Sequence, residues 1–250
     1  MNNSFRLIAA SAVLSVSVAA GAAPISTNTI PYQSLVGPAV SFDTVTAQDF
    51  EGILDIGPAM FAERFVGQPR SYSGNFDVLG TGISGPLALA AGAPGANLAV
   101  YQWNGGHILL GMGWLGQDLP QAIGEGSIAA LFAADQSAFG FEFIGVDGGS
   151  ATLHFFRRDG ALIDAIVLQN LVNGAFVFSR GGGAADIAGF SLFNDDPDGI
   201  AIDNLRFTAQ LPPEGLAGPE PPTVETVPEP SVLALLALAG AFLGARRRAA

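Results

Sequence analysis

The stretch Ala138-Phe139-Gly140-Phe141-Glu142-Phe143-Ile144 decides the fold of this chain. Its phenylalanines recur at every second position, and Glu142 falls between two of them. Successive side chains of a β-strand point to opposite faces of a sheet, so this period places the three rings on one face. The stretch predicts a strand with one face in a core and the other toward solvent.

The sequence on both sides repeats short apolar runs bounded by turn residues. Asp147-Gly148-Gly149 predicts a turn, and Asp159-Gly160 predicts a two-residue hairpin loop. Strands are expected at residues 40–45, 98–103, 107–112, 127–132, 138–144, 151–157, 161–168, 175–179, 187–193 and 199–207. No window carries a sustained 3.6-residue apolar period with helix caps. We therefore predict an all-β domain over residues 42–208, a single antiparallel β-sandwich or jelly roll.

Composition excludes several classes of function. The chain has no cysteine, so disulfide bonds and a thiol nucleophile are excluded. It has no lysine, and four of its ten arginines, Arg6 and Arg246 to Arg248, lie near the ends. The region between them carries six arginines against 22 acidic residues, a formal balance of −16. Such a surface repels nucleic acid and anionic lipid and attracts divalent cations.

Residues 1–22 have the pattern of a secretory signal peptide. Arg6 supplies the positive start, residues 7–20 supply an apolar helical core, and Ala20-Gly21-Ala22 supplies a cleavage site with small residues. The apolar run is too short for an N-terminal membrane span. The Sec translocon and signal peptidase are therefore expected partners, and residues 23–41 are expected to be a lead-in to the domain.

The C-terminal end carries three features in a fixed order. Val227-Pro228-Glu229-Pro230-Ser231 precedes an apolar run over residues 232–245, and Arg246-Arg247-Arg248 follows the run. Arginines prefer the cytoplasmic side of a membrane, so this order predicts a hydrophobic transmembrane helix that halts export. From Ser231 to Ala245 a helix spans only ~22 Å, against a hydrocarbon core of ~30 Å. This length favours a transient anchor over a permanent one. The preceding residues 209–226 are rich in proline and predict an unfolded linker.

This tail resembles the PEP-CTERM protein-sorting signal of exopolysaccharide-producing Gram-negative bacteria. The resemblance rests on Pro228, Glu229 and Pro230, on the apolar run and on the terminal arginines. It implies recognition by an exosortase, a membrane transpeptidase, and release or transfer of the protein near the Pro-Glu-Pro. The implied destination is the cell surface or the extracellular matrix.

The middle of the chain resembles the jelly-roll ectodomains of PEP-CTERM proteins, which are similar to carbohydrate-binding modules and concanavalin-like sandwiches. The resemblance rests on five short motifs: Asp49-Phe50-Glu51-Gly52, Phe65-Val66-Gly67, Phe139-Gly140-Phe141, Asp159-Gly160 and residues 199–205. Such relatives often hold a structural calcium ion between their first and last strands. The resemblance implies Glu51 and Asp203 as its ligands; no other cofactor is expected.

Two further observations bear on a metal ion. Asp203 shares strand parity with Leu205 and Phe207, which directs its carboxylate toward the core, where it needs a partner or a metal. A bulge that turns it out to solvent and a hydrogen-bonded turn are the alternatives. Asn194-x-Asp196-x-Asp198-Gly199 imitates the start of a calcium loop. The bidentate glutamate of an EF-hand is absent, so an acidic β-turn is the alternative.

Tyr101, Trp103 and Trp114 are candidates for a sugar-stacking platform. Tyr101 and Trp103 lie on one face of a predicted strand, and burial in the core is the alternative for both.

There is no Gly-x-Ser-x-Gly elbow and no HExxH motif, and no carboxylate pair is singled out for glycoside hydrolysis. We therefore expect a non-enzymatic surface or matrix protein associated with exopolysaccharide in biofilm. A carbohydrate-binding module and a glycoside hydrolase or lyase are the alternatives. An exposed aromatic platform favours the former, and a cleft with two carboxylates the latter.

Overall fold

The computed structural model describes residues 23–46, 48–114 and 123–208. The chain divides into two units after residue 211, and all described residues belong to the first unit. The predicted signal peptide, the linker and the sorting tail with its hydrophobic helix lie outside the described residues. Within the described part of the chain, no helix is long and apolar enough to cross a membrane.

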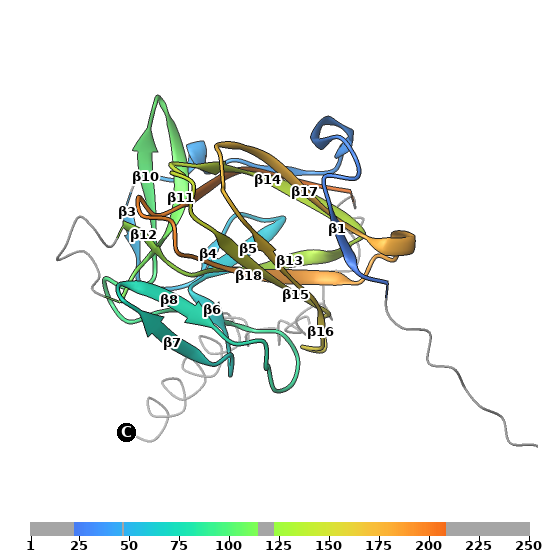
Figure 1. Cartoon of the computed structure of the whole chain (residues 1–250), viewed down its shortest axis with the longest axis horizontal. Helices are drawn as coiled ribbons and strands as arrows, with labels where there is room; N and C mark the ends of the chain where they lie inside the picture. Colours follow the sequence, from blue (N-terminus) through green and yellow to red (C-terminus); the bar gives the residue numbers. More distant parts are fainter. Residues whose placement is uncertain (1–22, 47, 115–122, 209–250) are drawn as a thin grey trace, which may run out of the picture. The chain divides into compact units, whose positions relative to one another are not determined.

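The first of the two large antiparallel sheets follows the order β1-β17-β14-β19-β11-β10-β3; Figure 1 labels most of these strands. In addition, β12 pairs with β11, and β2 pairs with β19. Its strands are β1 (Ile25–Thr27), β2 (Ala39–Val40), β3 (Gln48–Phe50), β10 (Leu98–Trp103), β11 (Gly106–Met112), β12 (Ile123–Gly126), β14 (Ala138–Ile144), β17 (Gly174–Arg180) and β19 (Ala201–Phe207). The second sheet follows the order β16-β15-β18-β13-β5-β4. Its strands are β4 (Leu54–Asp55), β5 (Ala59–Ala62), β13 (Ile128–Gln136), β15 (Ala151–Phe156), β16 (Leu162–Leu168) and β18 (Ile187–Asn194).

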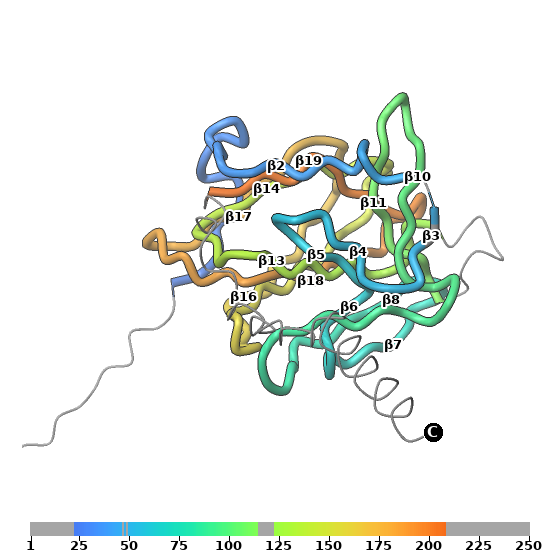
Figure 2. Tube along the Cα trace, turned by 180° about the vertical axis from the view of Figure 1, so that it is seen from behind, coloured from blue at the N-terminus to red at the C-terminus, as the bar shows by residue number. Residues whose placement is uncertain are grey.

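Two small two-stranded sheets lie beyond the second sheet, so the domain has three layers in section (Figure 2). They are β6 (Arg64–Phe65) with β9 (Leu89–Ala90), and the hairpin of β7 (Arg70–Ser73) with β8 (Phe76–Leu79). Short 3-10 helices form at η1 (Tyr32–Ser34), η2 (Phe42–Thr44) and η5 (Gly181–Gly183).

The core lies between the two large sheets and is built on the phenylalanines of β14. Phe139, Phe141 and Phe143 are fully buried, as the alternating pattern predicts. The Phe139 ring stacks on Phe190 of the facing β18, with centroids 5.1 Å apart and planes 14° apart. Such an aromatic pair contributes roughly 0.5–1.5 kcal/mol beyond the area that it buries. The prediction of an all-β antiparallel sandwich is confirmed.

The strands are wound as in a jelly roll over much of the chain, because β13, β14 and β15 alternate between the sheets, as do β17, β18 and β19. The β10–β11 and β15–β16 pairs depart from this pattern as hairpins within one sheet.

The loop between β15 and β16 is longer than Asp159-Gly160 predicts. Arg157 N–H donates to the Ala161 carbonyl over 2.9 Å, which leaves three loop residues, with Gly160 at φ +89°. The two-residue prediction is therefore wrong by one residue.

The N-terminal part of the domain differs from two expectations. Residues 40–45 form the end of β2 and then η2 in place of one strand, because the Ser41 hydroxyl accepts from Asp43 N–H over 3.3 Å and starts a turn. Residues 23–41 are not merely a lead-in. Strand β1 pairs with β17, and Ile25 N–H donates to the Asp164 carboxylate of β16 over 2.8 Å. The segment thereby joins the edges of both sheets.

Candidate functional site

The outer face of the first sheet carries a cavity of about 420 Å³ beside the β10–β11 hairpin. In the register of this hairpin Tyr101 lies opposite Ile108, and Trp103 lies opposite Gly106 at the turn. Tyr101 is 37% exposed and Trp103 is 51% exposed, and both line the cavity. The alternative that these two rings belong to the core is therefore wrong.

The rest of the cavity is mainly apolar. Its lining includes Ile108, Leu110, Ile144 and Ala201, which the strand period turns away from the core. A wall forms where residues 123–124 meet residues 198–200, and Ile200 N–H donates to the Gly124 carbonyl over 3.0 Å. Gly124 has φ +89°, and a Cβ there would lie 2.8 Å from the Ile200 nitrogen, so this wall requires glycine.

Gln102 and Asp198 are the polar residues with charged or amide side chains among the described lining, and Asp198 is the one acidic residue there. We call this site the aromatic cleft; its described lining residues are Tyr101, Gln102, Trp103, Ile108, Leu110, Ile123, Gly124, Ile144, Gly145, Asp198, Gly199, Ile200 and Ala201. A mostly apolar concave surface with a few polar groups is the usual composition of a small-molecule site.

Trp114 does not join this platform. It follows β11 at the end remote from Trp103, and its ring packs against Tyr72 of β7 with centroids 5.7 Å apart. The three-aromatic platform is corrected to a pair, because a sequence does not show which distant hairpin lies beside the end of a strand. Tyr72, which sequence reasoning missed, is the partner of Trp114.

Asp203 does not face the core, because β19 contains a bulge. Gly140 pairs with Arg206 and Glu142 with Asp203, so two steps along β14 correspond to three along β19. The extra residue is Asn204, which has φ +52°. Asp203 consequently lies on the outer face beside Glu142, and it is 8% exposed. Burial raises the pKa of its carboxyl group, to which the nearby charges of Asp43 and Glu142 add.

Glu51 and Asp203 are not placed to share a calcium ion. Glu51 follows β3, and β3, β10, β11 and β19 are successive neighbours in the first sheet. Three spacings of about 4.8 Å separate the two strands by roughly 14 Å, whereas calcium binds its oxygen ligands within about 2.6 Å. Among the described residues, no three acidic or histidine side chains are arranged to hold a metal ion. The implied ligand pair is therefore wrong.

The Asn194-x-Asp196-x-Asp198 sequence forms a turn that is held by hydrogen bonds. The fully buried Asp196 carboxylate accepts from the backbone N–H groups of Asp147 and Gly149 over 3.0 and 2.9 Å. The Asn194 amide donates to the Gly124 carbonyl over 2.8 Å. The side chains of this calcium-like sequence therefore fix the loops next to the aromatic cleft.

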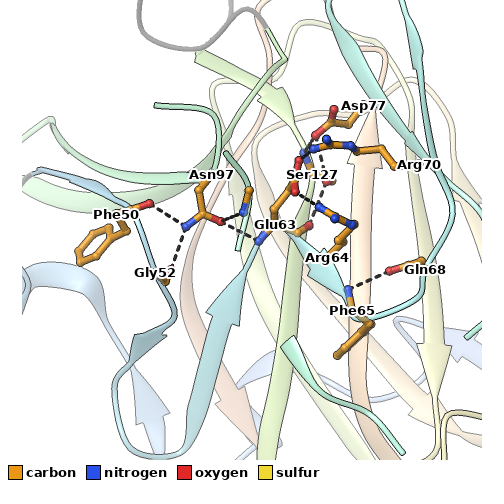
Figure 3. Close-up of polar contacts among 11 residues, drawn as sticks. Phe50, Gly52, Glu63, Arg64, Phe65, Gln68, Arg70, Asp77, Asn97 and Ser127 are labelled. Atoms are coloured by element: carbon orange, nitrogen blue, oxygen red, sulfur yellow. Dashed lines mark hydrogen bonds and ion pairs between the residues drawn. The ribbon is translucent and has the colours of Figure 1, made fainter. Parts of the chain in front are cut away.

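A second group of polar residues is buried under the β7–β8 hairpin (Figure 3). Glu63 is fully buried, and its carboxylate forms ion pairs with Arg64 and Arg70. Asp77 of β8 is also fully buried and accepts from the backbone N–H and the hydroxyl of Ser127, each over 3.0 Å. Burial raises the pKa of the Asp77 carboxyl group. We call these residues the hairpin network.

The hairpin network bears on the hydrolase alternative. A glycosidase presents two carboxyl groups to a substrate in an open cleft. Glu63 and Asp77 are both 0% exposed, and arginines neutralise Glu63. Asn97 extends the network, since its amide donates to the Phe50 and Gly52 carbonyls over 2.7 and 2.8 Å (Figure 3). The arrangement ties the hairpin and β5 to the sandwich and gives a substrate no access.

In a comparison with known families, residues 226–248 match the model of the PEP-CTERM protein-sorting motif. This match confirms the resemblance that Pro228, Glu229, Pro230 and the terminal arginines carry, and it marks the chain as an exported protein whose C-terminal signal an exosortase processes. Curated proteins and solved structures give no match.

Proposed function

We propose that this protein acts at the cell surface or in the extracellular matrix as a non-enzymatic protein that binds exopolysaccharide. The sorting motif supports a role outside the cytoplasm. The observation that carries the binding role is the aromatic cleft, where two half-exposed rings, Tyr101 and Trp103, line one cavity. In this proposal the domain is a carbohydrate-binding module.

The chemistry of the cleft suits a sugar ring. The face of an aromatic ring is electron-rich, so it attracts the C–H groups on the apolar face of a pyranose. Tyr101 and Trp103 supply such faces, and Gln102 and Asp198 supply polar atoms for hydroxyl groups. The volume of about 420 Å³ lies within the ~300–1,000 Å³ of ordinary ligand sites.

The negative charge of the protein favours a neutral polysaccharide over an anionic one. The formal balance of −16 between the terminal arginines opposes an anionic chain, and Asp198 adds a negative charge in the cleft itself. The expected ligand is therefore a neutral polysaccharide. Among the described lining residues Asp198 is the one acid, whereas glycoside hydrolysis needs two carboxyl groups, and this supports a binding role for the cleft.

Affinity electrophoresis of the exported protein tests this function. Gels containing a neutral β-glucan, galactomannan or xylan are compared with gels containing anionic alginate. At least one neutral polysaccharide should retard the wild type, and Trp103→Ala should weaken binding about tenfold, or ~1.4 kcal/mol. Val167→Ala is the control, because Val167 is 53% exposed on β16 in the other sheet. Equal retardation of the wild type and Trp103→Ala would contradict the proposal that the aromatic cleft binds the polysaccharide.

A further inference from the structure

Tyr72 and Trp114 form a second pair of exposed aromatic rings. Tyr72 is 46% exposed and Trp114 is 50% exposed, and their ring centroids are 5.7 Å apart at an interplanar angle of 43°. Burial in the core therefore does not account for either ring. We call them the hairpin pair.

Contacts with the rest of the domain hold both rings of the hairpin pair in place. Arg70 pairs with the buried Glu63 of the hairpin network, and its guanidinium lies 5.1 Å from the Tyr72 ring centroid (Figure 3 shows Arg70 and Glu63). The Trp114 indole N–H donates to the Gly74 carbonyl in the hairpin turn over 2.9 Å. Both rings are thus oriented before any ligand arrives, which lowers the entropic cost of binding.

We propose that the hairpin pair is a second carbohydrate-binding surface, separate from the aromatic cleft. The inference rests on the proposed function for the class of ligand, a neutral polysaccharide. The size of the surface favours this occupant. Two half-exposed rings offer a sugar a stacking face, whereas a stable protein interface buries about 800 Å² on each partner.

The two surfaces lie too far apart to serve one sugar ring. Trp103 pairs with the first residue of β11, Gly106, and Trp114 lies two residues beyond the last, Met112. The six steps of ~3.3 Å from Gly106 to Met112 alone separate them by about 20 Å along the strand. One domain would therefore hold polysaccharide at two points, which raises the avidity for a long chain and permits a bridge between chains.

The sequence supplies a direct probe, because it contains two tryptophans, one in each surface. In Trp103→Phe the remaining tryptophan reports on the hairpin pair, and in Trp114→Phe the remaining tryptophan reports on the cleft. Each variant of the exported protein is titrated with the β-glucan, galactomannan and xylan used above, and tryptophan emission is followed. We expect a saturable change in both variants. Adding Tyr72→Ser to Trp103→Phe should weaken the Trp114 response at least tenfold.

The outcomes separate this inference from the proposed function. A response from Trp103 with silence from Trp114 would remove the second surface and leave the cleft. A response from Trp114 alone would support the second surface and contradict the cleft, and silence from both would remove both. An unchanged Trp114 response in the Tyr72→Ser variant would show that the ring pair is not the binding surface. Matching thermal melting of all variants establishes that each is folded.

Discussion

A single bulged residue determines to which face of the sheet the side chains of the neighbouring residues point. The bulge at Asn204 reverses the parity of β19, so Ile202 and Leu205 both enter the core while Asp203 does not. Period-two reasoning is valid only within an unbroken ladder, and a bulge breaks the ladder. The left-handed backbone of Asn204 therefore determines where the Asp203 carboxylate lies.

Replacing Asn204 tests this bulge. Asn204→Ala should lower the free energy of unfolding by roughly 1–2 kcal/mol, because alanine resists a left-handed backbone and the 2.9 Å hydrogen bond to Glu142 is lost. Asn204→Gly should cost less, since glycine adopts this backbone freely. Urea denaturation measures both. A glycine variant less stable than the alanine variant would contradict the role of the backbone.

His154 predicts a dependence of stability on pH. Burial lowers its pKa, although a hydrogen bond to the Gly80 backbone acts the other way. The unfolded chain takes up a proton below the ordinary value of 6.5 while the folded chain stays neutral, so stability is lost as pH falls through this range. His154→Gln should lose less stability than the wild type between pH 7.5 and pH 5 in thermal melts. Parallel losses would contradict the assignment.

At the scale of elements, β10 and β14 begin and end where the sequence predicts. Apolar alternation and turn residues also located β11 and the strands from β15 to β19, with boundary shifts of one or two residues, and β13, which continues four residues beyond its predicted end. The strands between residues 48 and 90 were missed, because they are two to four residues long and several expose polar side chains. Gly74-Asn75 was an available signal, since these residues form the two-residue turn between Ser73 and Phe76.

The sequence predicted some residues of the two aromatic surfaces and missed others. Tyr101 and Trp103 were predictable, because both lie on one strand and share its period. The partner of Trp114 was not, because it depends on how the β7–β8 hairpin lies against the end of β11, about forty residues away in sequence. The hairpin network was equally hidden, since Asp77 and Ser127 meet only in the folded chain.

The hairpin network predicts the stability of one element. Ser127→Ala removes the hydroxyl whose one proton is shared between the Asp77 carboxylate, 3.0 Å away, and the Glu63 carbonyl, 2.9 Å away. Loss of these buried bonds should cost about 1–3 kcal/mol and speed hydrogen exchange in residues 70–79. Ser73→Ala is the control, because Ser73 is exposed on the same hairpin. Unchanged exchange in Ser127→Ala would show that the network does not hold the hairpin.

At the scale of the whole molecule, the chain joins a sorting signal to a domain with two exposed aromatic surfaces. The sorting motif marks the domain for export and exosortase processing, and in the proposed function the exported domain meets exopolysaccharide outside the cell. In the proposed account, the sandwich keeps the two surfaces about 20 Å apart along β11, so that one domain contacts a polysaccharide at two points. In the same account, the sorting signal brings this binding domain to its ligand.

The sorting step yields its own prediction. Replacing Pro228, Glu229 and Pro230 by alanine should leave export intact, because the N-terminal segment is unchanged, and should block C-terminal processing. Alanine replacement of Pro219, Pro221 and Pro222 in the linker is the control and should be processed normally. Intact-mass measurement of the recovered protein reads the result. A wild-type protein that retains Arg246 to Arg248 would contradict processing.

The central claim is that the aromatic cleft binds exopolysaccharide. Isothermal titration of the processed protein with exopolysaccharide from the producing cells tests it most directly. The account predicts saturable binding that Trp103→Ala weakens about tenfold and Val167→Ala leaves unchanged. Absence of binding, or equal affinities for the wild type and Trp103→Ala, would contradict the account.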